Sequence, residues 1–123
     1  MRGDFKLDKK SLLDRPKPLT ESLGGTKHDE GKPPMSLIPR PAMESEAMAL
    51  RYGRDKYGAY NFKKGFDYSR LIDAALRHIL AFNEGEELDS ESGVSHLGHA
   101  RACLAFLIDQ QARGTGKDDR FKG

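Results

Sequence analysis

The sequence SRLIDAALRHILAF, residues 69–82, determines the fold class. Its apolar residues recur three and four positions apart, which is the period of an α-helix and not the two-residue period of a strand. Ser69 is a favourable N-cap and Gly85 ends the pattern, so we predict a helix between them. The apolar arc covers about half of the helix circumference, and this helix should therefore contact two neighbours.

Further helices are predicted on either side of this one. The first runs from about residue 41 to residue 57, with Pro41 in its first turn and Gly58 as its C-cap. The last begins at Ser95, continues to about residue 111 and ends before Gly114. Its expected buried stripe is Leu97, Leu104, Leu107 and Ile108. No useful two-residue alternation is present, so the sequence predicts an all-α fold, a small helical bundle of about three main helices.

The remaining segments are polar or rich in proline. Residues 1–28 have no continuous apolar face, and we predict that they form a flexible N-terminal arm. The segment DEGKPPMSLIPRPAM contains four prolines, which disfavour a helix and favour an extended strap that buries Met35, Leu37 and Ile38. The predicted helical domain covers residues 29–112, and a flexible charged tail follows at 113–123.

Length and charge exclude several classes of protein. A chain of 123 residues fits one small domain, and 21 basic against 19 acidic residues give a net charge of +2. This mixed charge does not fit a protein that binds duplex nucleic acid through its phosphates. The one cysteine, Cys103, is expected to pack in the core and suits a reducing compartment. The sequence lacks a bilayer-spanning run and a signal peptide, which predicts a soluble cytoplasmic protein.

Three histidines can meet at one end of the bundle. His96 and His99 lie three positions apart in the first turn of the last helix, and His78 lies late in the helix before it. An antiparallel hairpin across loop 84–94 would bring them together beside the loop acids, as a divalent-metal site. Alternatively, the histidines are surface or capping groups, and the acids provide favourable charge ahead of a helix. The acids are Glu86, Glu87, Asp89 and Glu91.

A second candidate site is the connection YGRDKYGAYNFKKGFDYSR, residues 52–70. Glycines, aromatic rings and basic groups together are typical of a nucleotide pocket, because rings stack on a base and cations pair with phosphates. The spacing is not that of a P-loop, and the aromatic residues could instead close the end of the bundle. On the next helix, Asp73 and Arg77 either form a local ion pair or leave Arg77 available to bind phosphate.

Three blocks of the sequence resemble one protein family. They are DEGKPPMSLIP, YGRDKYGAYNFKKG and YSRLIDAALRHILAFNEGEELDSESGVSHLGHARACLAFLI, and they cover roughly residues 28–110. In this order they resemble the small, mostly bacteriophage dATP/dGTP diphosphohydrolase amino-terminal-like domains, which are related to the MazG-like all-α nucleoside triphosphate pyrophosphohydrolases. The third block is the most specific. Its matching positions are Arg77, His78, Gly85, Glu86, Asp89, Glu91, Ser92, Gly93, His96 and His99.

The resemblance implies a helical, oligomeric protein that cleaves a deoxypurine triphosphate to monophosphate and pyrophosphate with a divalent metal. MazG-like enzymes bind that metal with two E-x-x-E or E-x-x-D pairs, and this sequence has neither. Its first helix offers Glu44 and Glu46, about 200° apart around the helix, and His96 and His99 stand where an acidic pair is expected. A site rich in histidine favours Mn²⁺ or another transition metal over Mg²⁺.

We therefore predict a metal-dependent nucleoside triphosphate pyrophosphohydrolase, with Mn²⁺ or Mg²⁺ as its cofactor. The predicted catalytic residues are Glu87, His96 and His99, and Glu87 orients water. The predicted metal ligands are His78, Asp89, His96 and His99. The predicted substrate-binding residues are Lys56, Tyr60, Asn61, Phe62, Lys63, Lys64, Asp73 and Arg77.

Two other functions fit the same residues. One is a non-catalytic phage nucleotide-binding protein that sequesters a host nucleotide signal, and the other is a structural or regulatory phage protein that binds no nucleotide. The expected partners of the predicted enzyme are a small-molecule nucleotide and further copies of the chain, because the broad apolar arc leaves surface to cover. Duplex nucleic acid and membranes are not expected as partners, and the expected location is the host cytoplasm.

Overall fold

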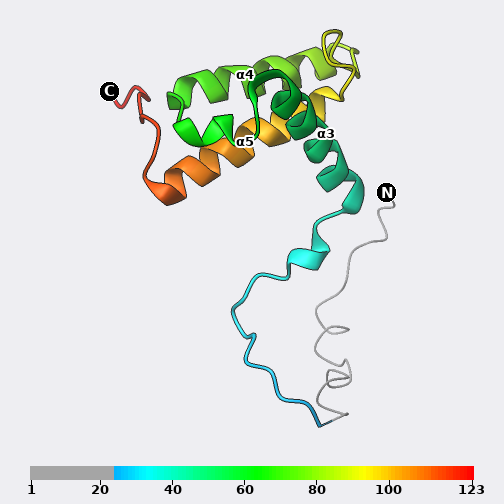
Figure 1. The fold of residues 1–123 in the computed structure, drawn as a ribbon, viewed down its shortest axis with the longest axis vertical. Coiled ribbons are helices and arrows are strands. Elements are labelled where there is room, and N and C mark those ends of the chain that lie inside the picture. The colour runs from blue at the N-terminus through cyan, green and yellow to red at the C-terminus, as the bar shows by residue number, and fades with distance from the viewer. Residues whose placement is uncertain (1–23) are drawn as a thin grey trace. The chain divides into compact units, whose positions relative to one another are not determined.

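The computed structural model describes residues 24–123, and the chain divides into two compact units, Met1–Pro34 and Met35–Gly123. The elements of the second unit are, in order, the 3-10 helix η1 (Met35–Leu37), α3 (Arg40–Tyr57), the 3-10 helix η2 (Asn61–Lys64), α4 (Tyr68–Asn83) and α5 (His96–Arg113) (Figure 1). Residues 24–123 contain isolated β-bridges but no strand, which confirms the predicted all-α fold. The predicted arm at residues 1–28 lies mostly outside the described residues.

Helix α5 is the central element of the bundle, because both α3 and α4 pack against it. Small side chains on α5 allow this close approach, since Gly98, Ala100 and Ala102 are all buried. The predicted buried stripe of this helix is wrong. Leu97, Leu104 and Ile108 are exposed, Ile108 by 66 % of its surface. Leu107, the fourth residue of that stripe, is half-buried. Because α5 has neighbours on two sides, small residues occupy its closest contacts and most of the predicted stripe faces outward.

Local signals fix most of the helix ends. Gly58 is the C-cap of α3, as predicted, and its backbone N–H donates to the carbonyl of Arg54. Ser95 is the N-cap of α5, where its hydroxyl accepts the N–H of Leu97 at 3.1 Å. Gly114 ends α5 in the left-handed conformation, with φ of 70°. These three predicted boundaries are confirmed.

The predicted start of α4 is wrong by two positions, because Asp67 and not Ser69 is the N-cap. The side chain of Asp67 makes no capping hydrogen bond. The cap comes instead from Asp119, whose carboxylate accepts the backbone N–H of Ser69 at 2.8 Å and also binds the Ser69 hydroxyl. Helix α4 is therefore capped by a side chain fifty residues away in the sequence.

Two parts of the chain contact the start of α4: a buried amide near the end of α5, and the segment that follows α5. Gln110 is 1 % exposed, and its side chain bonds both backbone groups of Phe66, accepting from N–H at 2.6 Å and donating to C=O at 3.2 Å. Lys117 then forms an isolated parallel bridge with Asp67. Residues 113–123, which the sequence predicted as a flexible tail, thus make defined contacts. The predicted domain limits, 29–112, stay a prediction.

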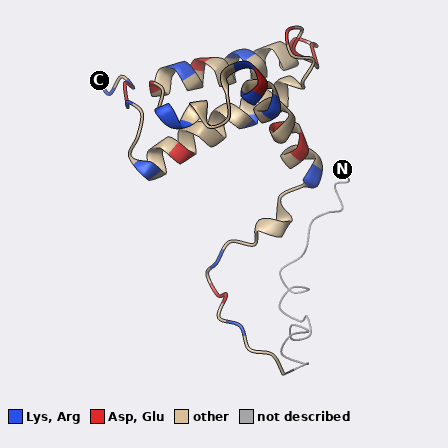
Figure 2. Ribbon diagram, in the orientation of Figure 1, with Lys and Arg blue, Asp and Glu red and all other residues tan. Residues whose placement is uncertain are grey.

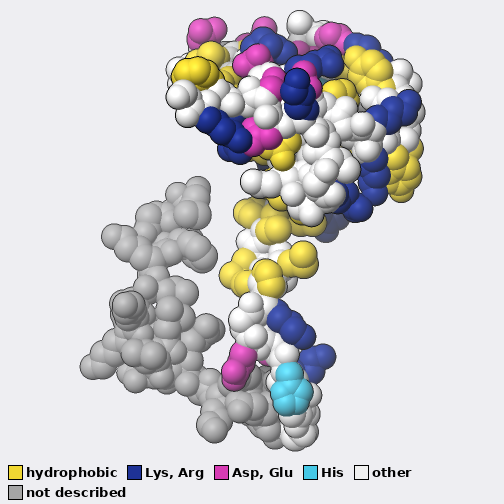
Figure 3. All heavy atoms as spheres, turned by 90° about the vertical axis from the view of Figure 1, so that its left-hand side faces the viewer, with side chains coloured by type: hydrophobic (Ala, Val, Ile, Leu, Met, Phe, Trp, Pro, Cys, Tyr) yellow, Lys and Arg dark blue, Asp and Glu magenta, His cyan; other side chains and the backbone are white. Residues whose placement is uncertain are grey.

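Apolar residues before α3 are exposed in the structure. The sequence predicted that Met35, Leu37 and Ile38 would be buried, but they are exposed by 75 %, 76 % and 44 % of their surfaces. Apolar side chains gather over the segment that leads into α3 (Figure 3). Leu76, Leu80 and Ile108 add exposed apolar surface on α4 and α5. Self-association over such surface stays a prediction. None of the helices in residues 24–123 is long and apolar enough to cross a membrane.

We predict that Gly98→Ala lowers the free energy of unfolding by about 1–3 kcal/mol, as overpacking does. A Cβ atom at Gly98 would lie 2.4 Å from the backbone oxygen of Ser45, so α3 and α5 would have to move apart. Gly53→Ala in α3 is the matched control, because a Cβ atom there meets nothing within 4 Å. The control should raise stability by about 0.5–1 kcal/mol. Urea unfolding measures both, and equal effects of the two substitutions would contradict this account of the packing.

Asp119→Asn should reduce the stability of the fold at neutral pH and should make that stability less dependent on pH. Hydrogen bonds from Ser69 lower the pKa of Asp119 from its usual 3.8, so the folded state favours the charged carboxylate. The stabilisation is therefore complete above the unfolded pKa and is lost as pH falls through the folded pKa. Thermal unfolding from pH 7 to pH 2 should show the two proteins converging below about pH 3.8. A melting-temperature difference that is constant with pH would refute the role of the charge.

Candidate functional site

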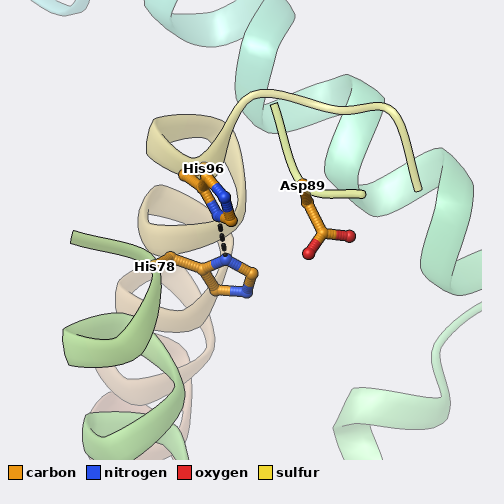
Figure 4. Close-up of side chains that lie close together, drawn as sticks. All are labelled: His78, Asp89 and His96. Atoms are coloured by element: carbon orange, nitrogen blue, oxygen red, sulfur yellow. Dashed lines mark hydrogen bonds between the residues drawn. The ribbon is translucent and has the colours of Figure 1, made fainter. Parts of the chain in front are cut away.

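Three histidines meet where the end of α4 lies beside the start of α5, as the sequence predicted. His78 Nδ1 lies 2.8 Å from His96 Nδ1, and the rings of His78 and His99 stack with centroids 4.6 Å apart. His78 comes from α4, His96 from α5 and Asp89 from the connecting loop (Figure 4). The antiparallel pairing of the two helices thus brings together residues eighteen positions apart.

The loop between α4 and α5, residues 84–95, is fixed by its own backbone. Asp89 donates its N–H to the carbonyl of Val94 at 2.8 Å and accepts the N–H of Gly93 at the same distance. Leu88 and Ser95 form an antiparallel bridge across the base of the loop. Acidic residues are concentrated in this loop (Figure 2). The loop therefore directs a specific carboxylate, that of Asp89, toward the histidines.

His78, Asp89 and His96 are arranged as a set of metal ligands. One ligand atom from each residue lies within 4.8 Å of the others. Two imidazoles and one carboxylate form a donor set that suits Mn²⁺, Fe²⁺ or Zn²⁺ better than Mg²⁺, which prefers oxygen alone. The residues present thus fit a transition-metal ion.

The charges in this cluster also fit a metal site. Burial, together with the neighbouring His99 and His96, lowers the pKa of His78 and favours the neutral imidazole that a metal requires. Burial alone would raise the pKa of Asp89, but hydrogen bonds from Ser92 outweigh it and lower the pKa. At neutral pH the cluster therefore offers a neutral imidazole and an ionised carboxylate.

His99, predicted as a fourth ligand, makes a different contact. Its Nε2 atom lies 2.7 Å from the hydroxyl oxygen of Ser92, and its ring packs edge-on against Tyr52 with centroids 6.0 Å apart. The Ser92 oxygen also accepts the N–H of Val94 at 3.1 Å, so its proton is free to be donated to His99. His99 borders the three ligand atoms but is not one of the set.

Two acids next to each other in the loop have different contacts. Glu86 Oε1 lies 2.6 Å from His96 Nε2. Glu87, which the sequence predicted as the catalytic acid, has an exposed side chain, and its backbone carbonyl accepts the N–H of His96 at 3.0 Å. The sequence placed Glu86 among the loop acids beside the histidines and among the positions that match the family, but it was not predicted as a catalytic, metal-binding or substrate-binding residue.

Lys56 is the predicted phosphate-binding residue that lies closest to this loop. Its Nζ atom lies 2.6 Å from Glu91, and the hydroxyl of Tyr52 donates to the same carboxylate. The hydrogen bond to Glu91 raises the pKa of Lys56, which keeps the ammonium group charged. Tyr52 and Glu91 were not predicted as site residues. They connect α3 to the loop that carries Asp89.

The predicted aromatic and basic residues of η2 lie toward the other end of α5. Phe62 stacks on Phe106 with centroids 4.5 Å apart, and Phe106 is ten residues after His96, about 15 Å along the helix. Lys63 lies over the exposed ring of Tyr60 at 5.2 Å. Asn61 and Lys64 belong to the same short helix. The structure therefore separates this group from the histidines.

Asp73 and Arg77 are both exposed on α4 and form no ion pair with each other, although the sequence offered that pair as one interpretation. Burial raises the pKa of the half-buried Cys103 thiol, and the charge of Arg77 partly offsets this effect. Arg77 is therefore close to Cys103 and, as its neighbour in sequence, to His78.

Comparison with known proteins gives one family and one relative of high similarity. Residues 22–120 match the family described as dATP/dGTP diphosphohydrolase, N-terminal. A curated protein of Salmonella phage PMBT28, named dATP/dGTP diphosphohydrolase, is 38 % identical over 96 residues. The match covers 78 % of this chain and 33 % of the relative, so the chain spans about a third of that protein's length. No solved structure matches the chain.

Proposed function

Because the chain belongs to the dATP/dGTP diphosphohydrolase N-terminal family, we propose that it hydrolyses a purine or deoxypurine nucleoside triphosphate to monophosphate and pyrophosphate. The observation that carries the proposal is the convergence of His78, Asp89 and His96, whose ligand atoms lie within 4.8 Å of one another. These three residues would bind a divalent metal. The proposed place of action is the host cytoplasm.

The bound metal would neutralise phosphate charge and activate water for attack on a phosphorus atom. The residues of the chain have separate tasks. His78 and His96 supply nitrogen ligands, and Asp89 supplies the negative charge that retains the ion. The donor set supports Mn²⁺ or another transition metal over Mg²⁺.

Lys56 is the proposed ligand for the triphosphate. Its present partner, Glu91, is an exposed carboxylate two residues from Asp89, so a phosphate beside Asp89 could compete for the same ammonium group. Arg77 is exposed and adjacent in sequence to His78, and it provides a second cation near the site. The residues of η2 would contact only a part of the nucleotide far from the metal.

A second candidate function is nucleotide binding without hydrolysis. One observation favours it. The acids of α3 are already paired, Glu44 with Arg40 at 3.0 Å and Glu46 with Arg101 at 3.2 Å. Such a protein would sequester the nucleotide, a host nucleotide signal for example, and release it unchanged.

Incubation of the purified protein with a panel of nucleoside triphosphates and Mn²⁺ or Mg²⁺ tests the proposal. The expected products are one monophosphate and pyrophosphate, identified by mass-resolved chromatography, and chelator should abolish their formation. Asp89→Asn should lower the rate by about 100-fold or more, because it removes the charged ligand of the metal. Asp109→Asn, which removes an aspartate paired with Arg113 near the other end of α5, is the matched control and should retain full activity.

The outcomes separate the two candidate functions. Recovery of intact nucleotide bound to the protein, with no product, would replace hydrolysis by the binding function. Turnover that survives both chelator and Asp89→Asn would contradict the metal assignment.

Lys56→Ala should raise the KM for the triphosphate about tenfold, because it removes a charge-assisted contact to phosphate. Lys64→Ala is the matched control, since it removes the same charge from η2, and it should change the KM by less than about twofold. Steady-state kinetics on the two variants makes the comparison. A larger rise in KM for Lys64→Ala than for Lys56→Ala would indicate that the triphosphate binds at the η2 end of the bundle.

A further inference from the structure

Both ring nitrogens of His96 are engaged inside the protein. The residue is 4 % exposed, with Nε2 at 2.6 Å from Glu86 Oε1 and Nδ1 at 2.8 Å from His78 Nδ1. A buried imidazole with two defined partners has little freedom to turn over or to change its tautomer. The identity of each partner therefore determines which nitrogen carries the proton.

The partner at Nε2 fixes the tautomer. An ionised carboxylate only accepts hydrogen bonds, so the nitrogen that faces Glu86 must carry the proton. A neutral His96 then has its lone pair on Nδ1, the atom that faces His78. In the metal-free protein His78 must accordingly carry its own proton on Nδ1 and donate it to His96.

The backbone around Glu86 sets the position of its carboxylate. Glu86 donates its N–H to the carbonyl of Ala81 at 3.0 Å, and Gly85 turns the chain there with φ of 105°. The adjacent Glu87 carbonyl accepts the N–H of His96 at 3.0 Å. Backbone bonds to Glu86 and Glu87 thus join the end of α4 to the start of α5, which places Glu86 within reach of the His96 ring.

We propose that Glu86 is a positioning residue that holds His96 with its proton on Nε2, so that the Nδ1 lone pair is directed at the metal. This inference rests on the proposed function, in which His78, Asp89 and His96 bind that metal. Carboxylates that accept a hydrogen bond from a metal-bound histidine orient the ring and increase its basicity, and their loss costs about 10–100-fold in metal affinity. Glu86 has the geometry of such a group.

Two measurements on the full chain test the role of Glu86. Nitrogen-15 NMR of the imidazoles in the metal-free protein reports the tautomers, and it should show His96 protonated on Nε2 and His78 on Nδ1. Calorimetric titration with Mn²⁺ and with Zn²⁺ reports affinity. Glu86→Ala should lower the affinity about 10–100-fold, and Glu86→Gln, which keeps an acceptor oxygen, should lose less. Glu84→Ala, at an exposed glutamate two residues before Glu86, is the matched control and should bind like the wild type.

Each outcome bears on a different part of the proposal. His96 protonated on Nδ1, or equal metal affinity in Glu86→Ala and wild type, would overturn the positioning role. A wild-type protein with the expected tautomers that binds neither metal would overturn the metal site itself, and with it the proposed function. If Glu86→Ala weakens metal binding as expected but the wild-type protein shows no turnover, the role of Glu86 is supported and only the proposed hydrolysis is refuted.

Discussion

The antiparallel pairing of α4 with α5 is the constraint on which the rest of the structure depends. The loop between them is short, and it is tied at both ends by backbone hydrogen bonds, from Glu86 to Ala81 and from His96 to Glu87. Because these bonds fix the ends of the two helices relative to each other, a histidine late in α4 and a histidine at the start of α5 must meet. The cluster of ionisable groups follows from the hairpin and needs no further element to assemble it.

The third helix adds the cationic side of the same region. Helix α3 packs on the small residues of α5, where Gly98 lies against Ser45, and Ala49, Val94 and Ala102 form a small core with Tyr52. This contact places Tyr52 and Lys56 against the loop, where both bind Glu91. One surface of α5 therefore supports the histidine cluster while another positions the lysine. Because Gly98 has no Cβ atom, α3 can lie close enough to α5 for both arrangements.

The sequence predicted the features that depend on neighbouring residues. Gly58, Ser95 and Gly114 end or begin helices through backbone geometry within one turn, so their signals are local. The meeting of His78 and His96 could also be predicted, because a short loop between two helices implies an antiparallel pair.

Features set by distant contacts could not be predicted. The cap of α4 comes from Asp119, which is fifty residues away from Ser69. The stripe of α5 that was predicted as buried is largely exposed, because α5 packs against two neighbours through its small residues. The choice of Glu86 over Glu87 depends on one positive φ at Gly85, which periodicity does not encode. Phe62 was assigned to a nucleotide by its residue type, and its stacking on Phe106 fits the alternative that the aromatic residues close the end of the bundle.

The charge of the candidate site distinguishes it from the acidic sites of MazG-like enzymes. Two acidic pairs around divalent ions leave a site near neutrality or below it, whereas two neutral imidazoles and one carboxylate around one divalent ion leave about +1. Lys56 adds one positive charge, which its partner Glu91 balances, and the carboxylate of Glu86 at His96 brings the total to about zero. In the proposed function a triphosphate, which is a polyanion, would therefore be held by the metal and by Lys56 once the phosphate replaces Glu91.

Two acids near the candidate site are already engaged. Glu86 binds His96, and Glu91 binds Lys56 and Tyr52. The side chain of Glu87 is exposed, so in the proposed function Glu87 is available to orient water, and Glu91 becomes a second base only when its contact with Lys56 is released. Lys56 is the contact that a phosphate can replace, because its partner is exposed and a phosphate offers the same charge-assisted bond. Substrate binding and the availability of Glu91 as a base are therefore coupled through a single ion pair in the proposed function.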